Sequence, residues 1–301
     1  MRRTPALLLC LLLVLAGCAA PSTQPAPQPE EPSPAAESET LAEPKPPAEP
    51  EVPAEPEQPQ EEAAGQQEAE APSGMAQVSI LDAGVTYTHE DGTELLSIQS
   101  QNITVTVPGK PEVEESINAD LRNLLEDANA EGLALSDTAE EDYSLALEDE
   151  REWYSYEYSL KAEVTRLDGQ VLSLRFDAYQ YTGGVHGYGF SYGRSYDLAS
   201  GSRLTLDFMS AQGASFWDTA LEQIQALCQT EDYADLLYPK GNYEDALPDV
   251  VQDTRFYLDE EGVVFVADPY LIGPYSSGTI QFCLPYSALE GVLKENYLPA
   301  A

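Results

Sequence analysis

A glycine-rich segment holds the residue types that could most readily form a binding loop. Residues 181–187 contain three glycines and a histidine, and a tyrosine follows directly. Glycine accepts positive φ angles and allows close backbone approach, so such a segment can lie against a ligand. No Gly-Lys-Ser or Gly-Lys-Thr follows, which argues against a phosphate loop. The residues of this candidate binding loop are Gly183, Gly184, His186, Gly187 and Tyr188.

Histidine chemistry is restricted to His89 and His186. The two do not have the spacing of a metal site such as His-x-x-x-His, and the chain contains no Gly-x-Ser-x-Gly elbow. We therefore predict no catalytic residue, no metal site and no cofactor. Three roles remain open for His186: an imidazole hydrogen-bonded to backbone, a residue of a binding loop, or a catalytic base. With so many acidic residues, some pair will always lie at the separation of glycosidase carboxylates, so an enzyme remains an alternative.

The first 18 residues have the features of an export signal. Arg2 and Arg3 precede an apolar run over residues 6–15, which is shorter than the roughly 20 residues of a membrane-spanning helix. Leu15-Ala16-Gly17-Cys18 resembles the bacterial lipobox, which implies lipid attachment at Cys18. Two acyl chains on one residue give stable membrane attachment. We expect a lipid-anchored protein with its folded part on the extracytoplasmic side of a cell membrane. An ordinary signal peptide with an incidental cysteine is the alternative.

Residues 19–74 have the composition of a tether. They hold 14 prolines, 13 glutamates, one lysine and no aromatic residue. Such a segment cannot bury enough apolar surface to offset the entropy of ordering, and Pro-Glu sequences favour extended polyproline II conformations. The sequence predicts a disordered Pro/Glu-rich tether without a catalytic role.

The charge of the chain restricts its partners. The formal net charge is -39, and residues 75–301 hold 40 acidic and 11 basic side chains. This balance excludes a nucleic-acid binder, because the phosphate backbone requires a basic face. A partner of this surface is expected to be cationic or neutral. Solubility alone is the other explanation of the charge.

Residues 75–301 have the pattern of an α+β fold, an antiparallel sheet with packed helices. Apolar residues recur at helical spacing in some segments and alternate with polar residues in others. Strands are predicted at 78–88, 95–107, 154–165, 172–178, 255–258, 263–267 and 279–284. Helices are predicted at 112–128, 137–150, 214–230 and 286–296.

Aromatic residues follow two of the predicted strands. Tyr154, Tyr156 and Tyr158 share one strand face, where they could form either part of the core or a carbohydrate-stacking platform. A second alternation, with Tyr188 at its start, continues through Phe190, Tyr192 and Tyr196.

Two cysteines remain after the signal segment. Cys228 lies in a predicted helix and Cys283 in a late strand. Export would place them where disulfides persist, so we predict that they pair. Two buried free thiols are the alternative.

Several motifs together resemble the extracytoplasmic domain of RsiV-type, lysozyme-sensing anti-sigma factors. They are Tyr181-Thr182-Gly183-Gly184-Val185-His186-Gly187, Tyr196-Asp197-Leu198-Ala199-Ser200-Gly201, Leu204-Thr205-Leu206, Phe256-Tyr257-Leu258, Pro269-Tyr270, Gly273-Pro274-Tyr275 and Leu284-Pro285-Tyr286. The resemblance covers roughly residues 80–298. It implies two abutting α+β units, which we place at 75–182 and 183–301, after the signal at 1–18 and the tether at 19–74.

The sequence departs from this family in its N-terminal part. A lipobox stands where RsiV-type proteins have a sigma-binding segment and a transmembrane helix, so no sigma factor is expected as a partner. The same module occurs beside peptidoglycan deacetylase domains, but the metal ligands of those domains are not found. The resemblance implies a cell-envelope lipoprotein with a non-enzymatic binding or sensing module. Its expected ligand is a lysozyme-like cationic protein or a cell-wall glycan such as peptidoglycan. The alternatives are an enzyme acting on envelope polysaccharide and a structural envelope lipoprotein.

Overall fold

The structure is a computed structural model that describes residues 67–68 and 74–299. The predicted signal, Cys18 and most of the predicted tether lie outside these residues. Gln67–Glu68, inside the predicted tether, forms a short strand, β1, which pairs with β2 at Ser79 and Ile80.

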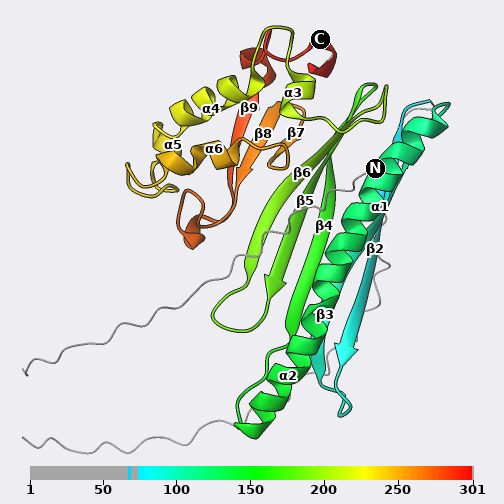
Figure 1. The fold of residues 1–301 in the computed structure, drawn as a ribbon, viewed down its shortest axis with the longest axis vertical. Helices are drawn as coiled ribbons and strands as arrows, with labels where there is room; N and C mark the ends of the chain where they lie inside the picture. Colours follow the sequence, from blue (N-terminus) through cyan, green and yellow to red (C-terminus); the bar gives the residue numbers. More distant parts are fainter. Residues whose placement is uncertain (1–66, 69–73, 300–301) are drawn as a thin grey trace, which may run out of the picture. The chain divides into compact units, whose positions relative to one another are not determined.

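The described chain is a mixed α+β fold with two sheets, as predicted (Figure 1). The larger sheet has the strand order β1-β2-β3-β4-β5-β6, and the smaller has the order β7-β8-β9. The larger sheet consists, after β1, of β2 Gln77–Thr88, β3 Glu94–Thr106, β4 Tyr156–Leu167, β5 Val171–Tyr181 and β6 Tyr188–Asp197. The smaller consists of β7 Phe256–Leu258, β8 Gly262–Ala267 and β9 Ile280–Pro285. The remaining elements are α1 Pro111–Leu133, α2 Leu135–Glu148, α3 Leu206–Met209, α4 Phe216–Leu227, α5 Glu231–Ala234, α6 Leu247–Val250 and the 3-10 turns η1 Glu244–Ala246, η2 Tyr275–Ser277, η3 Tyr286–Ala288 and η4 Glu295–Tyr297.

One strand pair differs from the predicted antiparallel arrangement. β3 and β4 pair in parallel, Leu96 to Gln99 against Tyr156 to Ser159. Parallel strands require a crossover, and α1 and α2 form it. β6 lies beyond the predicted division at residues 182 and 183, yet it pairs with β5 along its whole length. The larger sheet therefore continues to Asp197.

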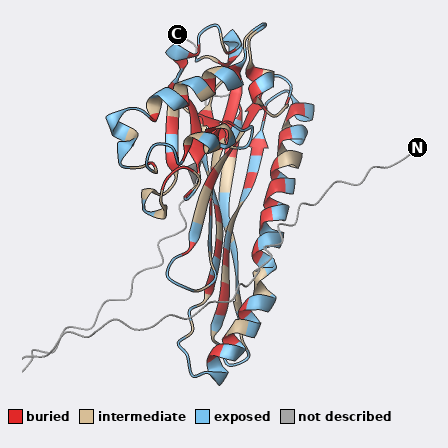
Figure 2. Cartoon of the chain, turned by 60° about the vertical axis from the view of Figure 1, so that its left-hand side comes forward, coloured by how far each residue is buried: buried red, intermediate tan, exposed pale blue. Residues whose placement is uncertain are grey.

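The long helix α1 covers one face of the larger sheet (Figures 1 and 2). Pro111 occupies the first helical turn, where its missing N–H costs nothing, and Glu112 and Glu114 lie at the positive end of the helix dipole. The buried side of the helix has the i, i+3, i+4 spacing of an amphipathic helix, with Val113, Ile117, Leu121, Leu124, Leu125 and Ala128.

Strand β4 shows the alternation that the sequence predicts. Tyr156, Tyr158 and Leu160 are buried, whereas Glu157 and Lys161 between them are exposed. The core interpretation of the tyrosine row is confirmed for Tyr156 and Tyr158. Tyr154 precedes the strand and is 56% exposed, so the three tyrosines form no continuous platform.

The smaller sheet packs against α4 and α6 around four phenylalanines, Phe216, Phe256, Phe265 and Phe282. All six residues of β8 are buried. The predicted helix at 286–296 is wrong, because only the 3-10 turns η3 and η4 form there. Gly291 between them has φ 75°, a left-handed conformation that interrupts a helix.

The predicted disulfide is also wrong, because both described cysteines are free thiols. Alternation along β9 directs Phe282 and Leu284 into the core that contains Cys228. Cys283 between them packs against the cluster of Tyr257, Val264 and Val266 instead. The two thiols therefore belong to opposite faces of the smaller sheet.

Small side chains of the larger sheet join the two sheets. The N–H of Gly193 donates to Thr254 O over 3.1 Å. The Ser173 hydroxyl accepts from Leu258 N at 2.9 Å, and the Thr165 hydroxyl donates to Leu258 O at 2.7 Å. The backbone of β7 is thus hydrogen-bonded by the sheet on which it lies, which fixes the loops of the smaller sheet relative to β6.

Candidate functional site

The candidate binding loop connects β5 to β6. Gly183 and Gly184 have φ of 86° and 90°, so both need the conformational freedom that glycine provides. Val185, next to them, is fully exposed. The predicted loop residues are therefore brought together at a tight, solvent-facing turn.

Contacts with η2 join this loop to the smaller sheet. The ring of His186 stacks on the ring of Tyr275, with centroids 3.9 Å apart and planes 21° apart. The Tyr275 hydroxyl donates to Gly187 O over 2.8 Å, and His186 Nδ1 lies 2.9 Å from the same oxygen. This geometry accommodates both the backbone-bonded role and the binding-loop role of His186. The loop that the sequence predicts is half of a composite surface.

Tyr270, in the loop between β8 and β9, is the second distinctive residue of this surface. Its φ is 71°, which is unusual for a residue other than glycine, and its side chain is 51% exposed. Its ring lies 5.6 Å from that of Tyr275. Residues held in sparsely populated backbone conformations cluster at functional sites. We call the loops 182–187 and 269–279, with the flanking Tyr179, Tyr181 and Tyr188, the glycine-loop surface.

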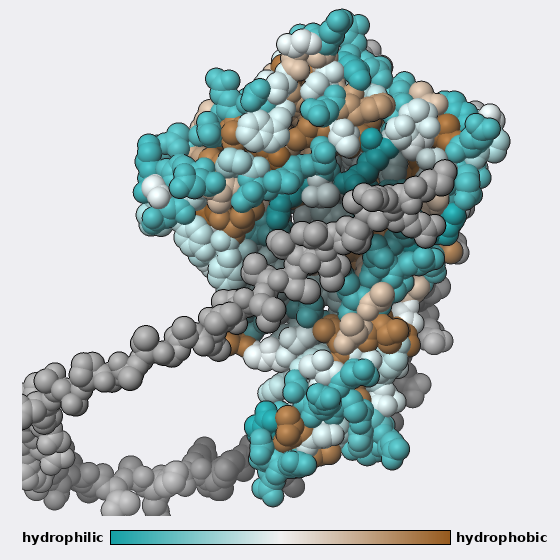
Figure 3. Space-filling model, in the orientation of Figure 1, coloured by the Kyte–Doolittle hydropathy of each residue, from teal (hydrophilic) through white to brown (hydrophobic). Residues whose placement is uncertain are grey.

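The two segments that meet here carry no charge. Residues 178–193 and 269–289 are the two longest stretches within 74–299 without an acidic or basic side chain, His186 counted as neutral. The surrounding chain is strongly acidic. The face visible in Figure 3 is mainly hydrophilic, with small separate hydrophobic patches. A neutral surface rich in tyrosine, glycine and serine resembles the composition of antibody binding loops.

A cavity of about 530 Å³ opens on this surface. Tyr179, Phe190, Pro269 and Tyr275 are among its lining residues, so it lies between the larger sheet and the loop that joins β8 to β9. Burial, and then the nearby Glu157, raises the pKa of Tyr179. Burial, and then Asp268, raises the pKa of Tyr188. Both hydroxyls therefore remain neutral hydrogen-bond donors at ordinary pH.

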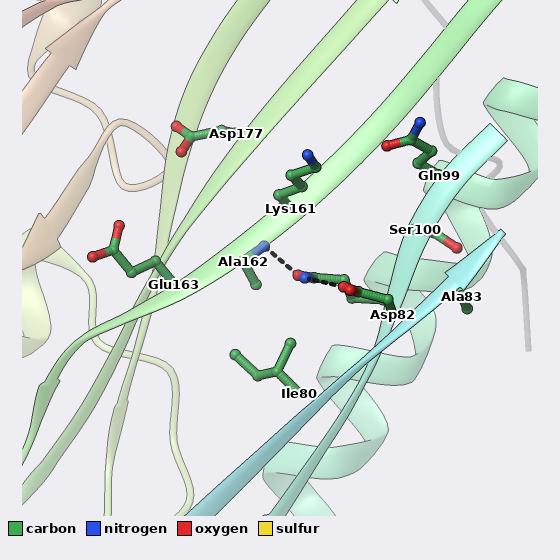
Figure 4. A pocket seen from close by; sticks show the side chains of 10 residues that line it. Ile80, Asp82, Ala83, Gln99, Ser100, Lys161, Ala162, Glu163 and Asp177 are labelled. Carbon is green, nitrogen blue, oxygen red and sulfur yellow. Dashed lines mark hydrogen bonds between the residues drawn. The ribbon is translucent and has the colours of Figure 1, made fainter. Parts of the chain in front are cut away.

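A larger cavity, of about 580 Å³, lies where β3 and β4 diverge (Figure 4). Gln101 bridges this gap: its Oε1 accepts from Ala162 N at 2.7 Å, and its Nε2 donates to Asp82 at 2.9 Å. No aromatic residue lines the cavity. Gln101 thus completes the hydrogen bonding of the separated strands, so we assign this cavity a structural role.

Two further features bear on function. Across the residues that the structure describes, no three His, Cys, Asp or Glu side chains converge in a way that could hold a metal ion. Within those same residues, every helix is too short or too polar to cross a membrane.

Comparison with known families gives two matches, one mainly in the part of the chain that forms the larger sheet and one in the part that forms the smaller sheet. Residues 90–188 match the model of the deacetylase PdaC family. Residues 212–287 match the model of DUF3298, a protein family of unknown function. The chain contains PdaC-like and DUF3298-like domains. No curated protein matches it.

One solved structure of a DUF3298 protein has a related fold, and a second DUF3298 structure also matches. One from Bacteroides fragilis is 20% identical, with a TM-score of 0.53 over 74% of this chain and 96% of that one. Another, from Pseudomonas aeruginosa PAO1, is also 20% identical, with a TM-score of 0.46 over 74% of this chain and 97% of that one. At this identity the Bacteroides structure supports the fold alone.

The sequence identified half of the glycine-loop surface. The loop from Gly183 to Tyr188 was predicted from its glycines, whereas Tyr270 and Tyr275 were noted only as part of a family resemblance. The positive φ of Tyr270 has no sequence signature, since glycine is the residue expected there. The absence of charge from both segments was the available signal.

Proposed function

We propose that the protein is a cell-envelope lipoprotein that displays a non-enzymatic binding or sensing module, with the glycine-loop surface as its binding face. One observation carries this proposal: the two longest uncharged segments of residues 74–299 meet at one tyrosine-rich surface with a strained, exposed Tyr270. Aromatic side chains concentrate binding energy in protein interfaces, and charged residues are depleted from interface centres.

The proposed ligand is a cationic extracytoplasmic protein of the lysozyme class. The acidic excess of residues 75–301 would attract such a protein. The resemblance to RsiV-type domains supports the same ligand. Charge alone would give a weak encounter, because exposed charges are screened beyond about 8 Å at physiological ionic strength. Specific binding must therefore depend on the neutral tyrosines of the glycine-loop surface.

The proposed location is a cell membrane, with lipid on Cys18 and the folded part on the extracytoplasmic side. Cys18→Ala should release the protein from membranes into the medium or periplasm. Unchanged partitioning of this variant into a detergent phase would contradict lipid anchoring. The anchoring test is independent of the ligand.

Calorimetry with lysozyme tests the proposed ligand. We expect binding at low salt that persists at about 0.3 M salt. Tyr270→Ala should weaken it strongly, whereas Leu81→Ala, at a similarly exposed residue of β2, three strands away from β5 in the larger sheet, should not. An unrelated protein of similar positive charge should lose its binding in salt.

Three results would replace this proposal. Equal, salt-sensitive binding of both cationic proteins would mean that the attraction is non-specific. Release of sugar from peptidoglycan would indicate the enzyme. If the protein binds neither lysozyme nor peptidoglycan, a structural lipoprotein would be favoured.

A further inference from the structure

A row of aromatic rings runs along β6 from the glycine-loop surface. Tyr188, Phe190 and Tyr192 alternate on one strand face, as the period of a β-strand requires. Successive ring centroids lie 6.1 Å apart, with planes inclined by 36° and 25°. Tyr188 is exposed and the other two are half-buried. We call these three residues the β6 strip.

The β6 strip leads into a groove of about 390 Å³ between α1 and β6. Phe190 and Tyr192 belong to both. The exposed carboxylates of Asp127 and Glu131 project from α1 on one side. Arg194 lines the groove from β6, and Arg255 and Asp268, which flank β7 and β8, line it from the smaller-sheet side. The size lies in the range of small-molecule sites, which combine aromatic surface with a few convergent polar groups.

The polar groups of this groove include donors and acceptors in close proximity. The Tyr158 hydroxyl donates to Glu131 over 3.3 Å, and Arg255 donates to Asp268 Oδ2 over 2.6 Å. Arg194 Nε and Asp268 Oδ1 are buried and have no hydrogen-bond partner among residues 74–299. Buried polar atoms are usually paired, so an unused donor and an unused acceptor beside one groove require explanation.

These features match one class of ligand better than others. Phosphate and other anions are disfavoured by Asp127 and Glu131, and a purely apolar ligand would leave the polar walls unpaired. A sugar ring has C–H faces that stack on aromatic rings and hydroxyl groups that both donate and accept. A β-1,4-linked chain is flat and extended, as is a row of rings along a strand, whereas an α-1,4-linked chain coils.

We infer that the β6 strip and its groove bind an oligosaccharide of β-1,4-linked pyranose rings. The sugar rings stack on Tyr188, Phe190 and Tyr192, and the hydroxyl edge meets Glu131 and Arg194. This site is distinct from the proposed protein-binding function, since its groove lies between α1 and β6 and does not include Tyr270. The two sites share Tyr188 at their boundary, and Phe190 lines both the groove and the cavity on the glycine-loop surface.

Titration of the purified protein with defined tetrasaccharides tests the inference. The probes are the β-1,4-linked tetramers of N-acetylglucosamine and of glucose, with the α-1,4-linked glucose tetramer as control, followed by NMR and calorimetry. We expect a β-linked tetramer to shift the resonances of Tyr188, Phe190 and Tyr192 and the α-linked tetramer to bind more weakly. Phe190→Ala should weaken β-tetramer binding about 3- to 10-fold, the value of one aromatic contact.

A second variant avoids disturbing the half-buried Phe190. Glu131→Gln keeps a side-chain oxygen that can accept from Tyr158 but removes the charge of a groove carboxylate, and it should weaken binding by about 10-fold. Glu126→Gln, on the same helix but outside the groove, should not weaken binding. Equal binding of the α- and β-linked tetramers, no binding of either β-linked tetramer, or unchanged binding by both Phe190→Ala and Glu131→Gln would overturn the inference. Tyr270→Ala should leave sugar binding intact, so failure of the lysozyme proposal would be visible separately.

Discussion

The two sheets bury their side chains in different ways. In the larger-sheet unit, tyrosines reach from the core to carboxylates on the covering helices: Tyr156 to Asp142, Tyr158 to Glu131, and Tyr196 to Asp120. In the smaller-sheet unit, phenylalanines fill the centre and every residue of β8 is buried. The first arrangement fixes α1 and α2 through directed hydrogen bonds, and the second relies mainly on apolar area. The units should therefore respond differently to substitution and to pH.

Removing one core ring should have the largest effect on either unit. Phe265→Ala deletes a fully buried ring that packs on Phe216 and Phe256, and should lower the free energy of unfolding by about 3–5 kcal/mol. Phe176→Ala is the matched change in the larger-sheet unit. In hydrogen exchange, each variant should lose protection mainly in its own unit. Equal loss in both units would mean that they unfold as one.

A methyl group at Gly193 should disturb the contact between the sheets. A Cβ there would lie 1.6 Å from Phe256 O, so β7 must move. We expect Gly193→Ala to lower the free energy of unfolding by about 3 kcal/mol. Gly189→Ala, on the same strand with its nearest atom at 3.5 Å, is the control and should cost less than about 1 kcal/mol. Equal thermal unfolding of the two variants would contradict the close approach.

Removing one tyrosine hydroxyl compares the hydrogen bonds of the two units. Tyr196 donates to Asp120 over 2.7 Å from a buried position, so Tyr196→Phe should cost about 1.5–2 kcal/mol. Tyr233 donates to the carbonyl of Gln281 over 2.8 Å at the surface of the smaller-sheet unit. Tyr233→Phe should cost about 0.5–1 kcal/mol. Denaturant unfolding measures both, and the reverse order would refute the distinction.

The smallest effect is expected from Tyr286 as pH changes. Burial raises the pKa of Tyr286 from 10.0 to about 12, against the opposing influence of Arg166. The folded state keeps this proton while the unfolded chain releases it near pH 10, so the stabilisation is complete below pH 10 and is lost as pH approaches 12. The hydroxyl also accepts from Arg166 and donates to Asp259 O.

Tyr286→Phe should therefore have a lower free energy of unfolding than the unchanged protein at pH 7, and this difference should become smaller between pH 10 and 12. Urea unfolding at several pH values measures the difference. A difference that is constant with pH would show that Tyr286 has the same pKa in the folded and unfolded states.

The fold was predictable where one physical rule dominated. Alternating apolar and polar residues predicted β4 and β5, and a stripe of apolar residues predicted α1, because each of these elements has one buried and one solvent-exposed side. The disulfide prediction failed because the sequence indicates which helix or strand holds Cys228 and Cys283, but not that the two side chains lie on opposite faces of the smaller sheet. The helix prediction at 286–296 was wrong because Pro285 is typical of a helix start, whereas Gly291 adopts a left-handed conformation that interrupts a helix.

The candidate site was predictable in part for a similar reason. Glycines and His186 identified the loop after β5, since their backbone freedom is local information. The stacking of His186 on Tyr275 joins residues from different sheets, and no local pattern specifies such a contact. The sequence also did not predict that the larger sheet continues through β6, because no local pattern specifies which strands pair.

The parallel pairing of β3 with β4 has a consequence for how the chain reaches this structure. The strand ladder between the first hairpin and the rest of the larger sheet runs from Leu96–Tyr156 to Gln99–Ser159. Each pair joins residues 60 positions apart, so closing this short junction costs loop entropy that the local hairpins do not, and formation of α1 and α2 shortens the intervening chain. The hairpins β2–β3 and β4–β5 are local and can form early. Closure of the β3–β4 junction should then be a slow step of folding, and the exposed strand edges before it would be the main opportunity for aggregation.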